Sequence, residues 1–321
     1  MMEPGWYYKL KDFFLEKFGG RVYKIPLHAG FTCPNRDGTI SRGGCIYCYN
    51  PSFSPSALRR EREGREEGVR EQLLSAMERM KRRRRGPADG EEPGFLAYFQ
   101  SYTNTYGDFA RLEKLYREAL ETPGILGLSI ATRPDCLEDE VLDLLEAYAR
   151  EYHIWLELGL QSSHDRTLKL INRGHDFEGF RESVLRCRDR GIFVCAHIID
   201  GLPGESLEDM LVTIERINEL PLQGIKFHQL QVMKGTPLFR MYEAGEVRIL
   251  EVAEYLEILC CQLEALRQDV VVHRLMSDVT DRELLAAPRW QVHPGSFSLR
   301  VEGELKGRGS YQGSRYVHRR T

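Results

Sequence analysis

Three cysteines stand close together near the N-terminus, in Cys33-Pro-Asn-Arg-Asp-Gly-Thr-Ile-Ser-Arg-Gly-Gly-Cys45-Ile-Tyr-Cys48. Thiolates hold iron–sulfur clusters, and a C-x2-C pair can ligate two irons of one cubane. The loop contains Gly38, Gly43 and Gly44, and glycine allows the left-handed backbone that brings a third thiolate back toward the pair. Three ligands leave one iron open. An open iron can bind the amine and carboxylate of a substrate, whereas a fully ligated cluster only transfers electrons.

Two other interpretations fit the same spacing. The cysteines could be buried core residues, although two glycines before a C-x2-C pair are a poor core pattern. A structural zinc site needs a fourth ligand, for which His28 is the nearest candidate. The remaining cysteines lack partners at ligand spacing, and Cys260 and Cys261 stand side by side in helical sequence, where neighbouring side chains diverge by about 100°. The spacing predicts a metal site and leaves iron–sulfur and zinc open.

The elements that position this loop follow an alternating pattern of strands and helices. A parallel sheet with crossover helices is expected from such alternation, and chemistry in such barrels lies at the carboxyl ends of the strands. The cysteine loop follows the first strand. A long helix over 250–267 and a mixed tail come last. The predicted strands are 21–27, 95–100, 125–132, 154–161, 193–200 and 224–232, and the predicted helices before that tail are 6–18, 60–85, 109–120, 138–151, 165–171, 177–190 and 207–219.

The composition is that of a globular protein, with 321 residues, 42% hydrophobic and 29% charged. No apolar run is long enough to cross a bilayer, and residues 1–11 lack the core of a signal peptide. We therefore expect a cytoplasmic protein without a membrane partner. The net charge of −3 means that nucleic-acid binding would depend on local patches. The candidate basic residues are 82–85, Arg308, Arg315, His318, Arg319 and Arg320, which could equally be solvated surface charges.

The cysteine loop, GFTCPNRDGT…GGCIYC, resembles the cluster loop of radical SAM enzymes. More narrowly, it is similar to the YhcC/YtqA-like branch, which is related to the Elongator catalytic subunit. The resemblance covers nearly the whole chain, because further segments match in the same order. These segments are YFQSYTNTY (98–106), ATRPD (131–135), ELGLQSS…INRGH (157–175), DGLPGE (200–205), VMKGTPL (232–238) and HRLMSDV…LLAAPRWQ (273–291).

The resemblance implies a fold and a chemistry. The fold is α/β, a partial (β/α)6 TIM-type barrel of the radical SAM type with a small C-terminal extension. The expected parts are an N-terminal helix (1–20), the core barrel (21–240) and the extension (241–321). Cys33, Cys45 and Cys48 would hold a [4Fe–4S] cluster, whose open iron binds S-adenosylmethionine (SAM). An electron from a flavodoxin- or ferredoxin-type donor would cleave SAM into methionine and a 5′-deoxyadenosyl radical, which makes the protein an enzyme.

The resemblance also implies residues that contact SAM. Tyr47 matches an aromatic residue near the adenine, and Arg173 matches an arginine that meets the carboxylate or ribose, which suits its bidentate fork. Glu157, Gly159 and Gln161 alternate onto one face of a strand, and Gln161 matches a SAM contact. The other candidates are Gln100, Ser101, His197 and Asp200. Many relatives have glycines at the first two positions, and some have an aspartate at the position of His197. Asp200 would lie near the adenine region. Ala131 replaces a glutamate of some relatives.

The kinship with the Elongator subunit suggests tRNA as the substrate, modified at the wobble uridine. The alternative is a non-enzymatic RNA-binding adaptor that holds zinc or a structural cluster on the same cysteines. Colour and oxygen sensitivity distinguish the enzyme from an adaptor that holds zinc, because an iron–sulfur protein absorbs in the visible and a zinc protein is colourless. The sequence leaves open the atom modified, the electron donor, the oligomeric state and the roles of the C-terminal extension, Cys260 and Cys261.

Overall fold

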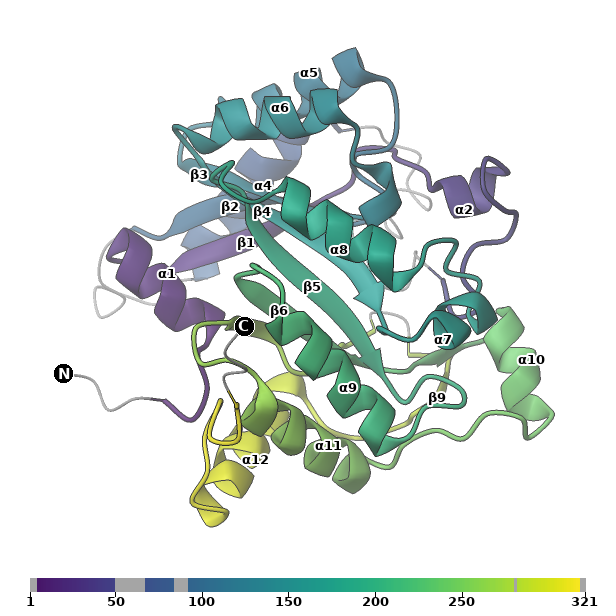
Figure 1. Cartoon of the computed structure of the whole chain (residues 1–321). Coiled ribbons are helices and arrows are strands. Elements are labelled where there is room, and N and C mark those ends of the chain that lie inside the picture. The colour runs from purple at the N-terminus through teal and green to yellow at the C-terminus, as the bar shows by residue number, and fades with distance from the viewer. Residues whose placement is uncertain (1–4, 50–66, 84–91, 280–281, 318–321) are drawn as a thin grey trace.

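The computed structural model of the chain describes residues 5–49, 67–83, 92–279 and 282–317. Its centre is a sheet of seven parallel strands that curls into a half-barrel (Figure 1). The spatial order follows the chain, as expected for consecutive right-handed crossovers. The strands are β1 (Val22–Leu27), β2 (Gly94–Phe99), β3 (Ile125–Thr132), β4 (His153–Gln161), β5 (Phe193–Asp200), β6 (Gly224–Gln229) and β8 (Val271–Arg274).

The helices cover the outside of this sheet (Figure 1). The crossover helices are α4 (Val69–Arg83), α5 (Phe109–Leu120), α6 (Asp139–Ala149), α7 (Asp165–Leu170), α8 (Phe177–Arg186), α9 (Leu207–Asn218) and α11 (Val252–Ala265). The remaining helices are α1 (Leu10–Phe18), α2 (Pro34–Asp37), α10 (Pro237–Glu243) and α12 (Pro294–Gly307). None of the described helices is long and apolar enough to cross a membrane.

Strand β4 shows how the sequence sorts the two faces of the sheet. Ile154, Leu156, Leu158 and Leu160 belong to the apolar core under the helices. The residues between them point to the barrel lumen, where Trp155 lies in an apolar layer and Glu157, Gly159 and Gln161 line a cavity. Because side chains alternate along a strand, one segment supplies both the core and the site. The fold predicted from the resemblance, a partial TIM-type barrel, is confirmed.

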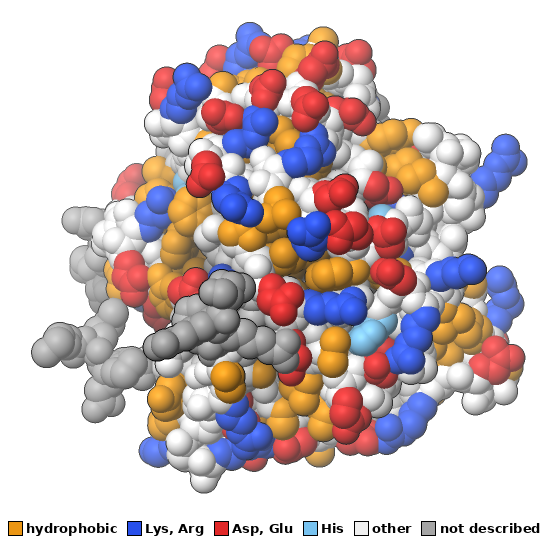
Figure 2. Space-filling model, in the orientation of Figure 1, with side chains coloured by type: hydrophobic (Ala, Val, Ile, Leu, Met, Phe, Trp, Pro, Cys, Tyr) orange, Lys and Arg blue, Asp and Glu red, His pale blue; other side chains and the backbone are white. Residues whose placement is uncertain are grey.

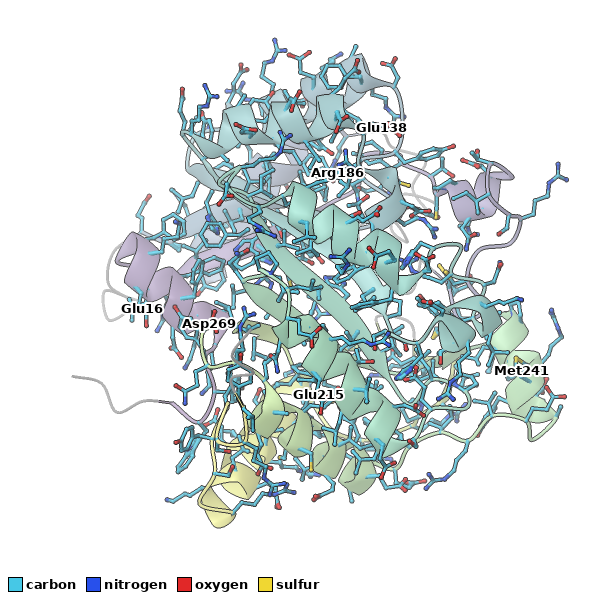
Figure 3. All side chains as sticks on the ribbon, viewed as in Figure 1. Glu16, Glu138, Arg186, Glu215, Met241 and Asp269 are labelled. Atoms are coloured by element: carbon cyan, nitrogen blue, oxygen red, sulfur yellow. The ribbon has the colours of Figure 1, made fainter. Side chains whose placement is uncertain are left out.

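Helix starts are specified by local capping residues. Asp108 accepts from Arg111 N at 2.9 Å at the start of α5, and Ser206 with Asp209 forms a capping box at the start of α9. Each such cap contributes about 1 kcal/mol. Neighbouring helices are also joined by ion pairs. The guanidinium of Arg186 on α8 is 2.6 Å from the carboxylate of Asp139 on α6. Figure 3 shows Arg186 near Glu138, the residue directly before α6.

The seventh strand was missed by the sequence analysis, which ends the strands at 224–232. Strand β8 comes from the range assigned to a C-terminal extension and pairs in parallel with β6. Its four residues, VVHR, are too short to show a period. The predicted strand 224–232 is interrupted after Gln229, and its end forms β7 (Val232–Met233), which pairs with β9 (Leu285–Ala287) in a separate two-stranded sheet.

The amino end of the barrel is closed by apolar side chains. Phe14 of α1 packs with Leu96, Trp155, Cys195 and Val271 from four different strands. Burying aromatic rings of this size is worth a few kcal/mol each. The lumen is therefore sealed at this end, and its accessible space lies toward the carboxyl ends of the strands.

Candidate functional site

A cavity of about 270 Å³ occupies the carboxyl end of the barrel. Its wall combines the cysteine loop with the ends of six strands, β2 to β6 and β8. The structure brings ten of the eleven predicted site residues to this cavity: Cys33, Cys45, Tyr47, Cys48, Gln100, Ser101, Glu157, Gln161, Arg173 and His197. Asp200 is not in this wall. Its buried carboxylate accepts from Gln262 of α11 at 2.7 Å, and burial raises its pKa to about 7.

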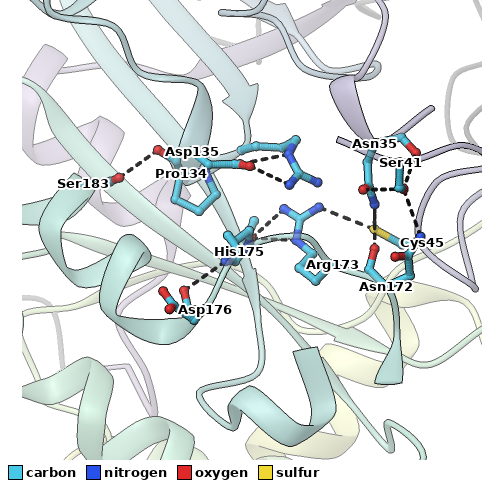
Figure 4. A network of polar contacts seen from close by, with 12 residues as sticks. Asn35, Ser41, Cys45, Pro134, Asp135, Asn172, Arg173, His175, Asp176 and Ser183 are labelled. Atoms are coloured by element: carbon cyan, nitrogen blue, oxygen red, sulfur yellow. Dashed lines mark hydrogen bonds and ion pairs between the residues drawn. The ribbon is translucent and has the colours of Figure 1, made fainter. Parts of the chain in front are cut away.

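The cysteine loop is held against the turn after α7 (Figure 4). Asn35 is fully buried and donates its amide to Asn172 O at 2.6 Å. Asn172 in turn donates to Gly44 O at 2.9 Å. Gly44 has φ +83°, which confirms that the loop uses the left-handed backbone glycine allows. These contacts fix Cys45, whose sulfur lies 3.5 Å from the Asn35 amide.

The three thiols line the same cavity and lie near enough to affect one another's charge. Burial, followed by the effects of Cys45 and Cys33, raises the pKa of the Cys48 thiol to about 11, although Arg36 opposes the rise. Among the described residues, no three His, Cys, Asp or Glu side chains are arranged to hold one metal ion. In a cubane each thiolate binds a different iron. Three cysteines on one cavity wall are therefore a donor set that fits a [4Fe–4S] cluster with one open iron.

Arg173 links the cysteine loop to β4. It is 6% exposed, and its guanidinium donates to Gly159 O at 2.6 and 3.2 Å and lies 3.7 Å from Cys45 Sγ. Burial alone would lower the pKa of Arg173, but Tyr47 and Cys45 outweigh burial and raise it. Its charge is therefore permanent, at the point where the cysteine loop meets the cavity.

Gly159 lies where the ends of two side chains approach the backbone closely. A Cβ at this position would lie 2.5 Å from Arg173 Nη2 and 2.6 Å from Gln161 Nε2. Gln161 ends β4 with φ +76°. A non-glycine residue in the left-handed region carries strain and is frequent at functional sites. The backbone there directs the Gln161 side chain into the cavity wall.

Glu157 forms the centre of a buried polar network in the lumen. Its Oε1 accepts from Lys24 at 2.6 Å and from Ser129 at 2.7 Å. Its Oε2 accepts from Lys226 at 2.6 Å, and Tyr98 and His197 donate to the same oxygen, each at 2.8 Å. Burial alone would raise the pKa of Glu157, but Lys226 and Lys24 outweigh it and hold the pKa well below its usual value.

His197 is a donor in this network. A carboxylate only accepts, so the His197 nitrogen at 2.8 Å from Glu157 carries a hydrogen. Burial, with a contribution from Lys226, lowers the pKa of His197 to about 4, so the ring is neutral at pH 7. Both Glu157 and His197 line the cavity, and the two carboxylate oxygens of Glu157 and Nε2 of His197 already have partners within the protein.

Besides Nε2 of His228 on β6, two buried polar groups in the cavity wall have no partner among the described residues. One is the hydroxyl of Ser101, which was predicted from the sequence. The other is Nη1 of Arg133, whose remaining nitrogens bind Asp135 at 2.9 and 2.7 Å. Arg133 lies in the ATRPD segment, which carried the resemblance but received no role. A buried donor without a partner is costly, and both groups are free to bind a ligand.

Comparison with known proteins identifies the class. The family model of the radical SAM superfamily matches residues 37–217, and the model of the radical SAM C-terminal domain matches 222–306. The chain belongs to the radical SAM superfamily, as the resemblance predicted. Its cofactors are a [4Fe–4S] cluster and SAM, and proteins of this kind need a reductant.

Individual relatives show which members of the superfamily the chain is similar to. The protein YtqA of Bacillus subtilis is 39% identical over 308 residues, which cover 96% of this chain and 92% of YtqA. YhcC of Escherichia coli K12 is 40% identical and covers 85% of this chain and 84% of its own. A tRNA uridine(34) acetyltransferase of Methanocaldococcus infernus is 30% identical over 48% of this chain and 29% of its own.

A solved structure has the same fold. The Elp3 protein of Methanocaldococcus infernus, with residues 1–46 deleted, superposes with a TM-score of 0.65. The match covers 91% of this chain and 64% of that chain at 18% identity. At that identity the likeness establishes the fold alone.

Proposed function

We propose that the protein is an enzyme that cleaves SAM reductively at a cluster held by Cys33, Cys45 and Cys48. The observation that carries this proposal is the placement of all three thiols on one wall of the barrel cavity. When bound, the cluster and SAM supply methionine and a 5′-deoxyadenosyl radical that abstracts hydrogen from a substrate. A flavodoxin- or ferredoxin-type protein is the proposed source of the electron, and the cytoplasm is the proposed location.

The protein's own residues bind and orient SAM in this scheme. Arg133 offers an unpartnered N–H and Arg173 a buried cation, and both suit a carboxylate. Ser101 offers a hydroxyl, Gln161 an amide, and Tyr47 a ring beside the cysteine loop. The apolar floor around Trp155 keeps water out from below, which strengthens every charge interaction above it.

The test is anaerobic reconstitution. The wild-type protein is expected to bind four irons, absorb in the visible and form 5′-deoxyadenosine after reduction. Replacing Cys33, Cys45 or Cys48 with Ala should abolish all three properties. Cys261→Ala, on α11, is the matched control and should change none. A colourless protein that binds one zinc ion through the same cysteines would establish the non-enzymatic adaptor instead.

We further propose that the substrate is a uridine at the wobble position of tRNA. Support comes from the tRNA uridine(34) acetyltransferase and from Elongator complex protein 3, which is 27% identical over 48% of the chain in Homo sapiens. The physical support is the half-open barrel, because the bases of single-stranded loops can turn outward into a cavity.

The basic candidates in the described part of the chain are paired with acidic side chains. On the face in Figure 2, basic and acidic side chains are interspersed. Arg308 and Arg315 are engaged by Glu304 and Glu264, each at 2.9 Å. Arg82 is exposed and pairs with Glu78. The other basic candidates, Arg84, Arg85, His318, Arg319 and Arg320, lie outside the described residues, as does the side chain of Arg83.

The substrate is tested by comparing nucleosides at the wobble position of tRNA from cells with and without the gene, by mass spectrometry. A change in one wobble uridine is expected. Binding of tRNA in vitro should weaken steeply with salt if phosphates are contacted. Identical nucleoside profiles together with no tRNA binding would refute the tRNA proposal and leave SAM cleavage unaffected.

A further inference from the structure

Strand β8 directs two side chains, His273 and Arg274, into the barrel lumen, because its pairing with β6 is irregular. Gly224 pairs with Val271 and Ile225 with Val272, but Lys226 pairs with Arg274. His273 is thus the extra residue of a bulge, a device that re-aims side chains. As a result His273 contacts Lys24 at 3.2 Å inside the barrel, and Arg274 also lines the cavity.

Arg274 has no carboxylate partner. Among the described residues it forms no hydrogen bond and no ion pair, although it lies beside Lys226 on the next strand. In the part of the chain that the structure describes, the lumen network contains one carboxylate, Glu157, and its oxygens already bind Lys24 and Lys226. Asp278, at the exposed mouth, is 3.8 Å from Arg282.

The three histidines beside these lysines and Arg274 add no positive charge to the lumen. Burial, with the neighbouring cations, lowers the pKa of His197 to about 4 and those of His228 and His273 well below their usual value. The rings are neutral at pH 7. Three cations, Lys24, Lys226 and Arg274, therefore face one buried carboxylate, and the lumen carries an excess of positive charge.

His228 adds an unpartnered polar atom to the same wall. Its Nε2 is buried and has no hydrogen-bond partner among the described residues. The ring packs against His197 with centroids 5.3 Å apart. His228 lies two residues after Lys226, on the same face of β6, and Lys226 is the register partner of Arg274. The unpaired guanidinium and the unpartnered ring nitrogen thus belong to adjacent strands and one cavity.

We propose that Arg274 and His228 bind an anionic group of the substrate, a carboxylate or a phosphate, on the wall formed by β6 and β8. Arg274 supplies the charge and a planar fork that matches two oxygens. His228 supplies one N–H and positions the group. The anion removes the excess positive charge of the lumen. This inference rests on the proposed function, because it takes the cavity to be the substrate site. The substrate would then be an anionic molecule.

The experiment is a calorimetric titration of the anaerobic, cluster-loaded protein with SAM bound. The probes are inorganic phosphate and acetate, with sodium chloride at matched ionic strength as the blank. Arg274→Gln should weaken binding of the preferred anion by about ten- to a hundred-fold, as expected when a charge-assisted hydrogen bond is lost. His228→Phe should weaken it less. Arg300→Gln, an exposed arginine of α12, is the control and should bind as the wild type does.

The probes distinguish the source of the anion. Preference for phosphate assigns the site to a nucleotide phosphate, and preference for acetate assigns it to a carboxylate. The inference is overturned if the wild type binds neither anion, if Arg274→Gln binds both as the wild type does, or if Arg274→Gln loses SAM affinity to the same extent. Formation of 5′-deoxyadenosine without substrate tests the proposed function separately, so its failure beside normal anion binding would refute the enzyme and not the anion site.

Discussion

Adding one methyl group at Gly159 should weaken SAM binding. The new Cβ of Gly159→Ala would lie 2.5 Å from Arg173 Nη2 and 2.6 Å from Gln161 Nε2, so both side chains must move. We expect Arg173 to move away from Gly159 O, which it now bonds at 2.6 and 3.2 Å, and to lose one contact with SAM. A hydrogen bond to a charged group is worth about 1.5–3 kcal/mol. SAM affinity should therefore fall by about ten- to a hundred-fold.

The assay is equilibrium binding of SAM to the anaerobically reconstituted protein. Gly303→Ala, on α12 where a Cβ meets no atom within 4 Å, is the matched control and should leave the affinity unchanged. A double-mutant cycle isolates the cause. If Gly159→Ala acts by displacing Arg173, it should have little further effect on SAM affinity in an Arg173→Ala background. Unchanged affinity in Gly159→Ala alone would refute the reasoning, and full additivity would show that Arg173 is not the route.

Two further predictions concern buried charges. Glu157→Gln leaves Lys24 and Lys226 without their anion and should lower the free energy of unfolding by about 3–5 kcal/mol in urea denaturation. Folding lowers the pKa of Glu157, so the stability that its charge contributes is present above pH 4.5 and is lost as the pH falls through the folded-state pKa. The free energies of unfolding of the wild type and the variant should therefore converge in acid. A difference that stays constant with pH would argue against an ionised Glu157. Arg133→Ala should weaken SAM binding by about tenfold or more in the same equilibrium binding assay, and equal affinities would remove Arg133 from the SAM site.

The sequence alone predicted the features that depend on local patterns within short segments of the chain. The cysteine spacing, the glycines of the loop and the alternation of strands with helices are local patterns, and most predicted elements lie within a few residues of the observed ones. Apolar periodicity and capping residues act over one or two turns. These patterns, with the family resemblance, were sufficient for the barrel, the cluster loop and the placement of the loop at the open end.

Only the tertiary structure decided what the lumen contains. Glu157, which the resemblance predicts to contact SAM, is the centre of a network to which β1, β2, β3, β5 and β6 each contribute a side chain: Lys24, Tyr98, Ser129, His197 and Lys226. The bulge that turns Arg274 inward and the pairing of Asp200 with α11 are equally invisible in the sequence. The reason is physical. A parallel barrel joins residues 28 to 249 positions apart through sheet register, and the charge balance of its interior depends on which of those side chains meet.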